Sequence, residues 1–339
     1  PLHSVYCQPF LENDGAEGES MDQHAIPMRE RLTRENLHGV WAAIATPFDE
    51  DDRFDEAVFR ENLRRLHAAG VHGIYTTDSD GEFYAIELDE FKRIIDVFAD
   101  EAQRLGVPTQ VGVTWCNTRG MADRAGYAAR QGILGAHVGH PFFMPMTPES
   151  YHAFWQDMRR AVPEWFALVH YNTPRVHNYQ YGPDYVQLAQ EVPNLVGTKH
   201  VGADVTEFLT LRACTPQLSH FTGEHAMTPY MFFGARGVYS WFANFNAPYM
   251  VRWYEDLAAG RWEEARGRQE RMHALIMACD LLRGSGNLHG IVGKALSAAS
   301  PFLVAQNRTR RPYLAIPNDT VQQFRRIMEE RFPDLLWQG

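Results

Sequence analysis

The feature that most constrains the fold of this chain is a regular alternation of short apolar segments and longer amphipathic segments. From residue 37 the short segments recur roughly every 30 residues, which is the length of one βα unit. Eight of them, rich in β-branched and aliphatic side chains, are expected to be strands. The predicted strands are Val40–Thr46, Gly73–Thr77, Thr109–Val113, Gly135–Val138, Phe166–His170, Leu195–Lys199, Ser219–Thr222 and Gly237–Trp241.

The segments between these strands have helical periodicity. In Phe54–Ala69, for example, the apolar residues Phe59, Leu63 and Leu66 fall on one helical face. The other clear cases are Leu88–Leu105, Asp184–Glu191 and Ala247–Ala259. Eight βα units without Pro/Gly-rich linkers predict an α/β fold of the closed (β/α)8 TIM-barrel type. An open doubly wound sheet is the alternative, but its glycine-rich dinucleotide fingerprint is absent after the first strand.

The alternation stops near residue 260, which predicts where the barrel ends. Arg261–Leu282, Ile291–Ala299 and Thr320–Arg331 all read as helices. We therefore expect a barrel over residues 37–260 and a helical extension over 261–339 that packs on it. Residues 1–36 are expected to form an N-terminal arm that is partly flexible.

Composition excludes several classes of protein. The 339 residues carry a formal net charge of −10, which argues against a nucleic-acid partner because nucleic-acid-binding proteins present basic patches. No apolar run reaches the roughly 18 residues of a transmembrane helix, so no membrane partner is expected. The N-terminal sequence lacks the pattern of a secretory signal. The four cysteines form no CxxC pair, and a reduced, cytoplasmic location is the prediction.

The carboxyl ends of the strands are where a barrel of this type places its chemistry. Only three lysines, Lys92, Lys199 and Lys294, stand beside 29 arginines. Lys199 ends the sixth predicted strand, with no carboxylate within four residues to hold it charged. Burial there would favour the neutral amine, the form that attacks a ketone to make a Schiff base. The alternative is a strand-end lysine that extends to solvent. Lys92 is expected on the surface and Lys294 in a structural role.

Two further strand ends bear on this chemistry. Tyr171 follows the fifth strand, next to the sixth in a barrel, so its phenol is a candidate proton carrier for Lys199. A tyrosine at the wet rim of the barrel is the alternative. Ser79, Asp80 and Gly81 form a loop of small residues after the second strand, and its neutral donors could bind a carboxylate. The alternative is a simple turn.

The fifteen histidines raise the question of a metal site. No HExxH motif or clustered carboxylates accompany them, so no metal is predicted. His170 and His200 alternate with Tyr171 and Lys199 along their strands. They should therefore face the opposite side and pack between barrel and helices.

The order of these motifs resembles that of a known family. Ser79-Asp80-Gly81-Glu82, Tyr171-Asn172-Thr173-Pro174 and Gly197-Thr198-Lys199 are similar to motifs of the dihydrodipicolinate synthase / N-acetylneuraminate lyase superfamily of class I pyruvate aldolases. The resemblance covers roughly residues 37–300. It implies a homotetrameric (β/α)8 barrel in which Lys199 forms a covalent imine with a 2-oxo acid such as pyruvate, without another cofactor. Tyr171 would relay protons, and Ser79 with its neighbouring amides would hold the carboxylate.

Departures from the family pattern argue against dihydrodipicolinate synthesis. Phe143 stands where the synthases carry a relay tyrosine, and Val176 stands where they carry an arginine, with Arg175 one step early. The usual threonine pair of the carboxylate loop is Ser79-Asp80 here. Because an ionised Asp80 would repel a bound carboxylate, its side chain should point away or meet another part of the substrate.

Other features resemble the hydratase-aldolase branch, which splits trans-o-hydroxy- or trans-o-carboxybenzylidenepyruvate into an aromatic aldehyde and pyruvate. Asn117-Thr118-Arg119 and Trp241 are similar to that branch. Asn117 is also a candidate, with Asn287 and His289, to bind the benzylic hydroxyl group. An aromatic wall at the barrel mouth would suit an aryl ring better than a sugar acid. The expected wall consists of Trp115, Phe142, Phe143, Trp241 and Phe242.

The sequence thus predicts a carbon–carbon lyase of the Schiff-base type that acts on an aromatic benzylidenepyruvate in the degradation of polycyclic aromatic compounds. One alternative is a keto-deoxy sugar acid aldolase or dehydratase, or another pyruvate-dependent lyase of the same superfamily. A non-catalytic 2-oxo acid sensor is a third possibility, against which the presence of both Lys199 and Tyr171 counts.

Overall fold

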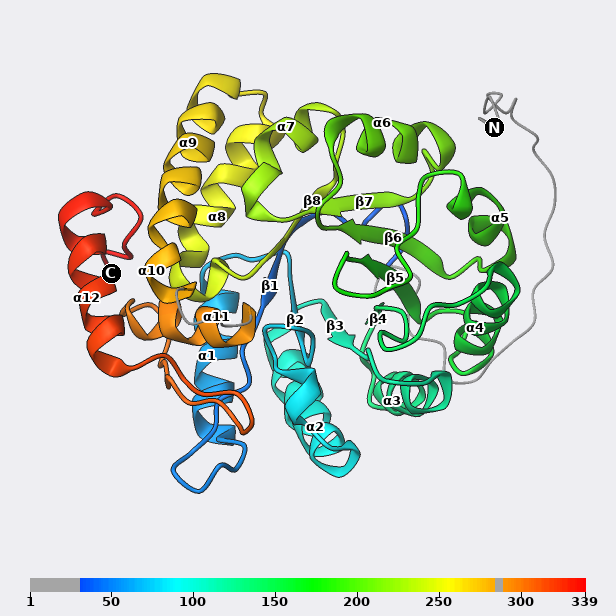
Figure 1. Ribbon diagram of the computed structural model, residues 1–339, viewed down its shortest axis with the longest axis horizontal. Coiled ribbons are helices and arrows are strands. Elements are labelled where there is room, and N and C mark those ends of the chain that lie inside the picture. Colours follow the sequence, from blue (N-terminus) through cyan, green and yellow to red (C-terminus); the bar gives the residue numbers. More distant parts are fainter. Residues whose placement is uncertain (1–30, 284–288) are drawn as a thin grey trace.

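The computed structural model describes residues 31–283 and 289–339 of the chain. Eight parallel strands form a closed barrel in chain order, with β8 paired to β1 (Figure 1). The strands are β1 Gly39–Ala43, β2 Gly73–Thr76, β3 Thr109–Gly112, β4 Gly135–Val138, β5 Ala167–Asn172, β6 Leu195–His200, β7 Ser219–Thr222 and β8 Gly237–Ser240. The predicted (β/α)8 fold is therefore confirmed, and each predicted strand overlaps the observed one.

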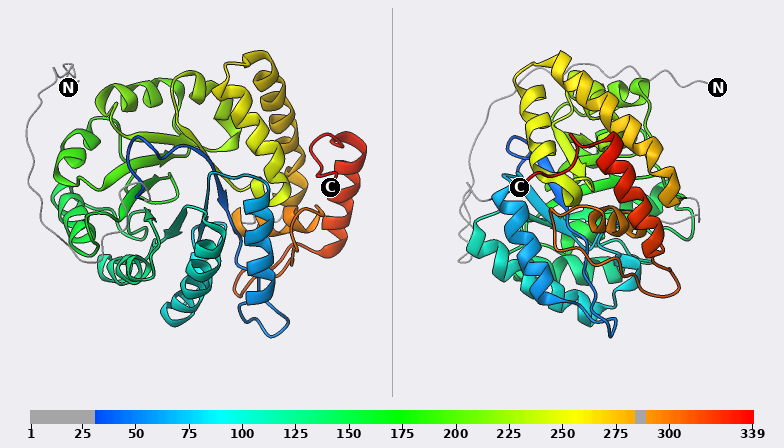
Figure 2. Two further views of the ribbon diagram at one scale, coloured as in Figure 1. Left: turned by 180° about the vertical axis from the view of Figure 1, so that it is seen from behind. Right: turned by 90° about the vertical axis from the view of Figure 1, so that its left-hand side faces the viewer.

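Helices surround the barrel, and further helices follow it (Figures 1 and 2). The barrel helices are α1 Glu56–Ala68, α2 Leu88–Leu105, α3 Thr118–Arg130, α4 Pro148–Arg160, α5 Asp184–Glu191, α6 Val205–Cys214, α7 Met227–Phe232 and α8 Ala243–Ala258. The C-terminal helices are α9 Trp262–Ala278, α10 Asp280–Arg283, α11 His289–Ala298 and α12 Asn318–Arg331. Within the described ranges, no helix combines the length and the apolar character needed to cross a membrane.

The two largest differences between predicted and observed helices concern Arg261–Leu282 and α8. The single helix expected over Arg261–Leu282 is divided into α9 and α10. Helix α8 begins four residues before the predicted Ala247 and contains a kink where Asn246 leaves the helical conformation (φ −159°, ψ 81°). The Asn246 side chain accepts a hydrogen bond from the Tyr249 N–H and donates one to the Leu335 carbonyl. The C-terminal segment therefore helps to hold this kink.

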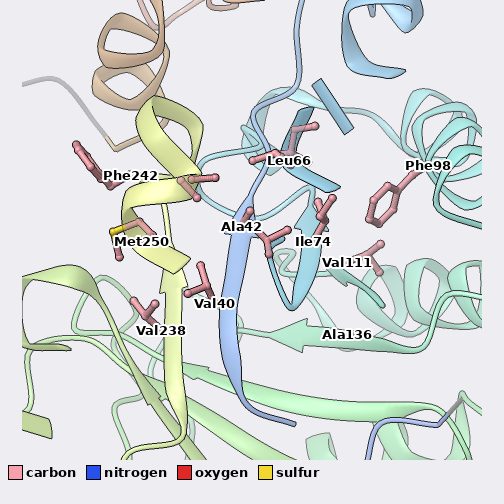
Figure 3. Packing of buried hydrophobic residues seen from close by; sticks show 14 of the residues in the cluster. Val40, Ala42, Leu66, Ile74, Phe98, Val111, Ala136, Val238, Phe242 and Met250 are labelled. Carbon is pink, nitrogen blue, oxygen red and sulfur yellow. The ribbon is translucent and has the colours of Figure 1, made fainter. Parts of the chain in front are cut away.

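The core has two layers that follow from the alternation of side chains along each strand. Along β1, Val40 and Ala42 belong to the apolar cluster between strands and helices, whereas Trp41 and Ala43 belong to the smaller cluster inside the barrel. Figure 3 shows Val40 beside Met250 of α8, in the outer cluster. The same alternation sends Tyr171 and Lys199 inward.

The histidines of β5 and β6 face the helices, as predicted. The His170 ring lies with Nδ1 2.6 Å from the Tyr185 hydroxyl of α5. The Nδ1 atom of His200 lies 3.2 Å from the Asn172 amide. Both rings are buried, so they act as packing groups.

Helix α11 is held on the barrel mouth by a buried ion pair between Lys294 and Glu82 of the loop after β2, whose side chains are 2% and 0% exposed. Lys294 Nζ also donates a hydrogen bond to the Arg308 carbonyl at 2.7 Å. These contacts agree with the structural role expected for Lys294.

Replacing Lys294 with methionine should lower the free energy of unfolding by about 3–5 kcal/mol at pH 7, because Glu82 would remain buried without its counter-charge. Burial raises the pKa of Glu82 even with Lys294 present. The variant's Glu82 should therefore take up a proton as the pH falls, and the loss should shrink towards pH 5. Urea unfolding at both pH values measures this, with Lys92→Met, at a lysine whose side chain is 40% exposed, as the control. Equal losses at the two pH values would contradict the explanation.

Candidate active site

Lys199 and Tyr171 meet across neighbouring strands at the carboxyl-end mouth of the barrel. They are direct partners in the register of β5 and β6. Lys199 Nζ lies 4.3 Å from the centroid of the Tyr171 ring. The two residues are 6% and 5% exposed. Closure of the barrel thus places Tyr171 and Lys199 next to each other, as predicted from the ends of the two strands.

Two further tyrosines complete a cage around the amine. Lys199 Nζ donates a hydrogen bond to the Tyr75 hydroxyl at 3.2 Å. It also lies 5.4 Å and 5.7 Å from the ring centroids of Tyr75 and Tyr239. Burial raises the pKa of both phenols well above the ordinary value, so both are neutral. The sequence analysis missed them, although the inward positions of β2 and β8 could have identified both.

The hydroxyl group of Tyr171 accepts a hydrogen bond from the Arg175 guanidinium at 3.0 Å. A phenol that receives a hydrogen bond from a cation is better able to bear negative charge, because the charge that develops on its oxygen is stabilised. Arg175 therefore assists Tyr171 in any step where the phenol gives up its proton.

The loop after β2, predicted to bind a carboxylate, has a tight conformation. Gly81 lies so close to the preceding backbone that a Cβ atom would stand 2.5 Å from the Thr77 nitrogen, and its carbonyl accepts a hydrogen bond from the Thr46 hydroxyl at 2.8 Å. Ser79 lines the adjacent cavity. Asp80 is 7% exposed, and burial raises its pKa to about 7. A Cβ at Gly293 of α11 would stand 3.4 Å from Asp80 Oδ1, which places this carboxyl group against α11.

A cavity of about 310 Å³ opens above Tyr171. Aromatic side chains form much of its wall, and polar groups contribute the rest. Its lining residues are Asp78, Ser79, Phe83, Tyr84, Thr114, Gly139, Phe142, Tyr171, Thr173, Arg175, Val176, Gly290 and Tyr313. Lys199 is not among these lining residues. The Tyr171 ring, which lines the cavity, lies next to Lys199 Nζ.

The aromatic wall is formed mostly by residues other than those predicted. Phe142 is the one predicted member that lines the cavity. The others are Phe83, Tyr84 and Tyr313, of which the last two are in edge contact at 4.8 Å between ring centroids. Tyr313 comes from the segment between α11 and α12, so no pattern near the barrel motifs could have indicated it.

The remaining predicted aromatics lie elsewhere. Trp115 is half-buried, and the guanidinium carbon of Arg124 lies 3.8 Å from the centroid of the Trp115 ring. Phe143 is 74% exposed, and Trp241 packs edge-on against Phe242. Phe242 is itself fully buried in the core. The structure does not bring these four side chains to the cavity.

Of the three polar groups predicted to bind the benzylic hydroxyl, Asn117 is the one whose side chain the structure describes. Asn117 is exposed and serves as the N-cap of α3, its side chain accepting a hydrogen bond from the Gly120 N–H at 2.9 Å. Asn287 lies outside the described residues. His289 begins α11, but its side chain also lies outside the described part.

The capping contact allows a direct test. Replacing Asn117 with alanine should cost about 0.5–2 kcal/mol of stability, the usual loss for an N-cap residue. Asn117→Ser, which retains a capping oxygen, should restore most of this loss. Thermal unfolding measures both variants. A large rise in KM with no change in stability would instead assign Asn117 to substrate binding.

No group of three or more His, Cys, Asp or Glu side chains suited to a metal ion occurs among residues 31–283 and 289–339. The contact between Lys199 Nζ and the Tyr171 ring supports the chemistry of an amine and a phenol. A buried lysine next to a tyrosine at the carboxyl-end mouth of a (β/α)8 barrel is an arrangement that can support the chemistry of a Schiff-base lyase.

Comparison with known proteins identifies the family. A profile of the dihydrodipicolinate synthetase family matches residues 36–331, so the chain belongs to this family. An N-acetylneuraminate lyase from Rhizobium meliloti is 28% identical over 264 residues, covering 76% of this chain and 86% of the lyase. A 4-hydroxy-tetrahydrodipicolinate synthase from Thermus thermophilus is 30% identical over 228 residues, covering 66% and 75%.

Solved structures show the same fold. A prophage protein of the dihydrodipicolinic acid synthase family from E. coli K12, solved with pyruvate, aligns with a TM-score of 0.80 at 18% identity, covering 87% of this chain and 98% of that one. The family's enzymes use a Schiff-base lysine and no external cofactor. The chain is accordingly an enzyme, a pyruvate-dependent carbon–carbon lyase of the class I aldolase type.

Proposed function

We propose that this enzyme cleaves an aromatic benzylidenepyruvate to an aromatic aldehyde and pyruvate, with Lys199 as the nucleophile and Tyr171 as the proton carrier. The observation that carries the proposal is the position of the Tyr171 ring, 4.3 Å from Lys199 Nζ, beneath a cavity walled by aromatic side chains. The rings of Phe83, Phe142 and Tyr84 offer surfaces on which an aryl group can stack.

The mechanism follows from the electronic demand of the imine. The amine of Lys199 attacks the 2-oxo carbon, and loss of water leaves a cationic imine conjugated with the alkene. This cation withdraws electrons, so water adds at the benzylic carbon. Retro-aldol cleavage then releases the aldehyde and leaves an enamine, which is protonated and hydrolysed to pyruvate and free Lys199. Tyr171 passes protons in imine formation and removes the proton of the benzylic hydroxyl group in cleavage.

The carboxylate of the substrate would lie against Ser79, and Arg175 also lines the cavity. A loop of neutral donors with one guanidinium nearby is suited to an anion. The buried Asp80 carboxyl group, with a pKa of about 7, is partly protonated at neutral pH and repels the anion less than an ionised aspartate would.

A keto-deoxy sugar acid aldolase or dehydratase is the second candidate. Two observations favour it: the similarity to the N-acetylneuraminate lyase, and the hydroxyl-bearing residues Ser79, Thr114 and Thr173 in the cavity. Hydroxyl groups of a sugar acid would pair with these side chains, whereas an aryl ring would leave them to water.

Two measurements test the proposal in sequence. Borohydride reduction with pyruvate, followed by peptide mass spectrometry, should modify Lys199 and spare Lys92 and Lys294. Substituted benzylidenepyruvates should then lose their enone absorbance on incubation with the enzyme, and keto-deoxy acids should turn over far more slowly. No adduct on Lys199 would exclude the Schiff-base role, and a 2-oxo acid sensor would then be favoured. Comparable turnover of sugar acids would favour the second candidate.

We also propose that the enzyme is a cytoplasmic homotetramer in which residues 1–36 form an arm, 37–260 the catalytic barrel and 261–339 a packed extension. The family resemblance supports the oligomeric state, and light scattering after size-exclusion chromatography tests it. A monomer would contradict the tetramer. Deletion of residues 1–36 tests whether the arm contributes to assembly.

A further inference from the structure

A carboxylate–imidazole pair lies inside the barrel mouth and has no part in the mechanism above. Asp78 follows β2, and His137 is the third residue of β4. His137 Nδ1 lies 3.2 Å from Asp78 Oδ2, and the two side chains are 0% and 3% exposed. With the proton on Nδ1, the imidazole donates a hydrogen bond to the carboxylate and fixes its orientation.

This pair shares its surroundings with the amine of Lys199. The His137 ring centroid lies 4.7, 6.3 and 4.1 Å from those of Tyr75, Tyr171 and Tyr239. These are the three tyrosines that enclose Lys199 Nζ. The imidazole and the amine therefore occupy one cage, and the partner carboxylate lies at the cavity wall.

The charge of Lys199 acts to lower the pKa of three buried carboxyl groups, which have different hydrogen-bond partners. They are Asp78, Asp80 and Glu224. Glu224 Oε1 accepts hydrogen bonds from the Ser240 hydroxyl and the Phe242 N–H. Burial nevertheless raises the pKa of Glu224. Burial likewise raises the pKa of Asp80 to about 7, although the charges of Lys199 and, to a smaller extent, Arg175 oppose the rise.

Asp78 behaves differently from these two carboxyl groups. Burial acts to raise its pKa, but the hydrogen bond from His137 and the charge of Lys199 outweigh burial and hold the pKa below its ordinary value. Burial lowers the pKa of His137, and that of the nearby His225, so both imidazoles are neutral at pH 7. Asp78 is thus the carboxyl group of this set whose pKa is held below its ordinary value, and its partner His137 packs against the tyrosines that surround the amine.

From this arrangement we propose that Asp78 is the counter-ion of the positive charge at Lys199 and that His137 is the positioning residue that holds Asp78 in place. The proposal rests on the proposed Schiff-base function for its catalytic meaning. In imine formation a protonated amine and a ketone become a protonated imine and one water molecule, so the positive charge is conserved. Asp78 remains ionised and stabilises the cation on both sides of this step.

The coupling can be measured without any substrate, because the chain has only three lysines. Trace acetylation with acetic anhydride over a pH series, read by peptide mass spectrometry, reports how readily each amine loses its proton. In Asp78→Asn the midpoint pH of Lys199 labelling should fall by about one unit or more, since loss of the anion disfavours the ammonium form. Lys92, whose side chain is partly exposed, is the internal standard.

Matched variants separate positioning from a structural role. His137→Leu removes the donor to Asp78 and should move the midpoint in the same direction by a smaller amount. His137→Asn keeps an N–H donor near the place of Nδ1 and should restore the wild-type midpoint. His170→Asn, at a buried histidine on the outer face of β5, should leave the midpoint unchanged. A midpoint that does not move in Asp78→Asn overturns the proposal, as does a uniform loss of labelling at every pH.

A second arm distinguishes this inference from the proposed function. As the pH is raised, the yield of borohydride-trapped pyruvate should fall at a lower pH in Asp78→Asn than in the wild type. The reason is that the protonated imine has lost its counter-ion. If the acetylation midpoint moves but the wild type traps no pyruvate, the proposed function fails while the counter-ion role of Asp78 stands. If pyruvate is trapped and both pH profiles are unchanged by Asp78→Asn, the counter-ion role fails alone.

Discussion

Replacing Lys199 with arginine should abolish the pyruvate adduct and lower turnover by at least about 10⁴-fold, the scale seen when a covalent nucleophile is removed. A guanidinium group stays protonated in any environment of this kind and cannot form an imine. The replacement keeps a long basic side chain at the position that Tyr75 and Tyr171 enclose. The expected variant is therefore folded and inactive.

Borohydride trapping, turnover of the benzylidenepyruvate and thermal unfolding together test this result. Because the larger guanidinium group could strain a cage that is almost closed to solvent, Lys199→Met is a second variant with a similar side-chain length. Both should unfold as a single transition and form no adduct. Residual trapping in either variant would show that another amine, Lys92 or Lys294, is the nucleophile.

Replacing Tyr171 with phenylalanine should lower kcat by about 10²–10⁴-fold, the range of a positioned general acid–base group. The aromatic ring over Lys199 Nζ is retained, and only the hydroxyl group that accepts the Arg175 hydrogen bond is lost. Imine formation should slow because the carbinolamine lacks its proton carrier. The adduct should still form on long incubation, which separates a slow enzyme from one that cannot react.

The matched control is Arg175→Gln, which keeps a neutral donor near the Tyr171 hydroxyl. It should lower kcat less than Tyr171→Phe does and should raise KM if Arg175 also contacts the substrate carboxylate. Stopped-flow measurement of enone loss gives both constants. If Tyr171→Phe retained wild-type kcat, the proton carrier would have to be a different group, and the Tyr75 hydroxyl, 3.2 Å from Lys199 Nζ, would be tested next.

Local patterns were sufficient for the barrel and for its central pair. The periodicity of each segment indicates which of its side chains face each side of the strand. Closure of eight parallel strands then places all their carboxyl ends at the same mouth of the barrel. Lys199 and Tyr171 were therefore predictable, as was the outward packing of His170 and His200. The inward tyrosines Tyr75 and Tyr239 obey the same rule but were not singled out.

The cavity wall was less predictable because it depends on loop conformations. Trp115 and Phe143 follow strand ends as expected, yet one packs under Arg124 and the other faces solvent. A residue in a loop has no periodicity that assigns it a side. The cavity lining does include aromatic side chains, but Phe142 is the one member that the predicted wall and the observed wall share.

The sequence by itself determined the eight βα units, the family and the two residues at the centre of the proposed chemistry, because these depend on residues close together along the chain. Only the tertiary structure decided that Tyr313 meets Tyr84 at the cavity, that Arg175 reaches the Tyr171 hydroxyl and that His137 holds Asp78. The physical reason is that these contacts join side chains whose positions are set by the packing of distant segments. No local pattern in the sequence records that packing.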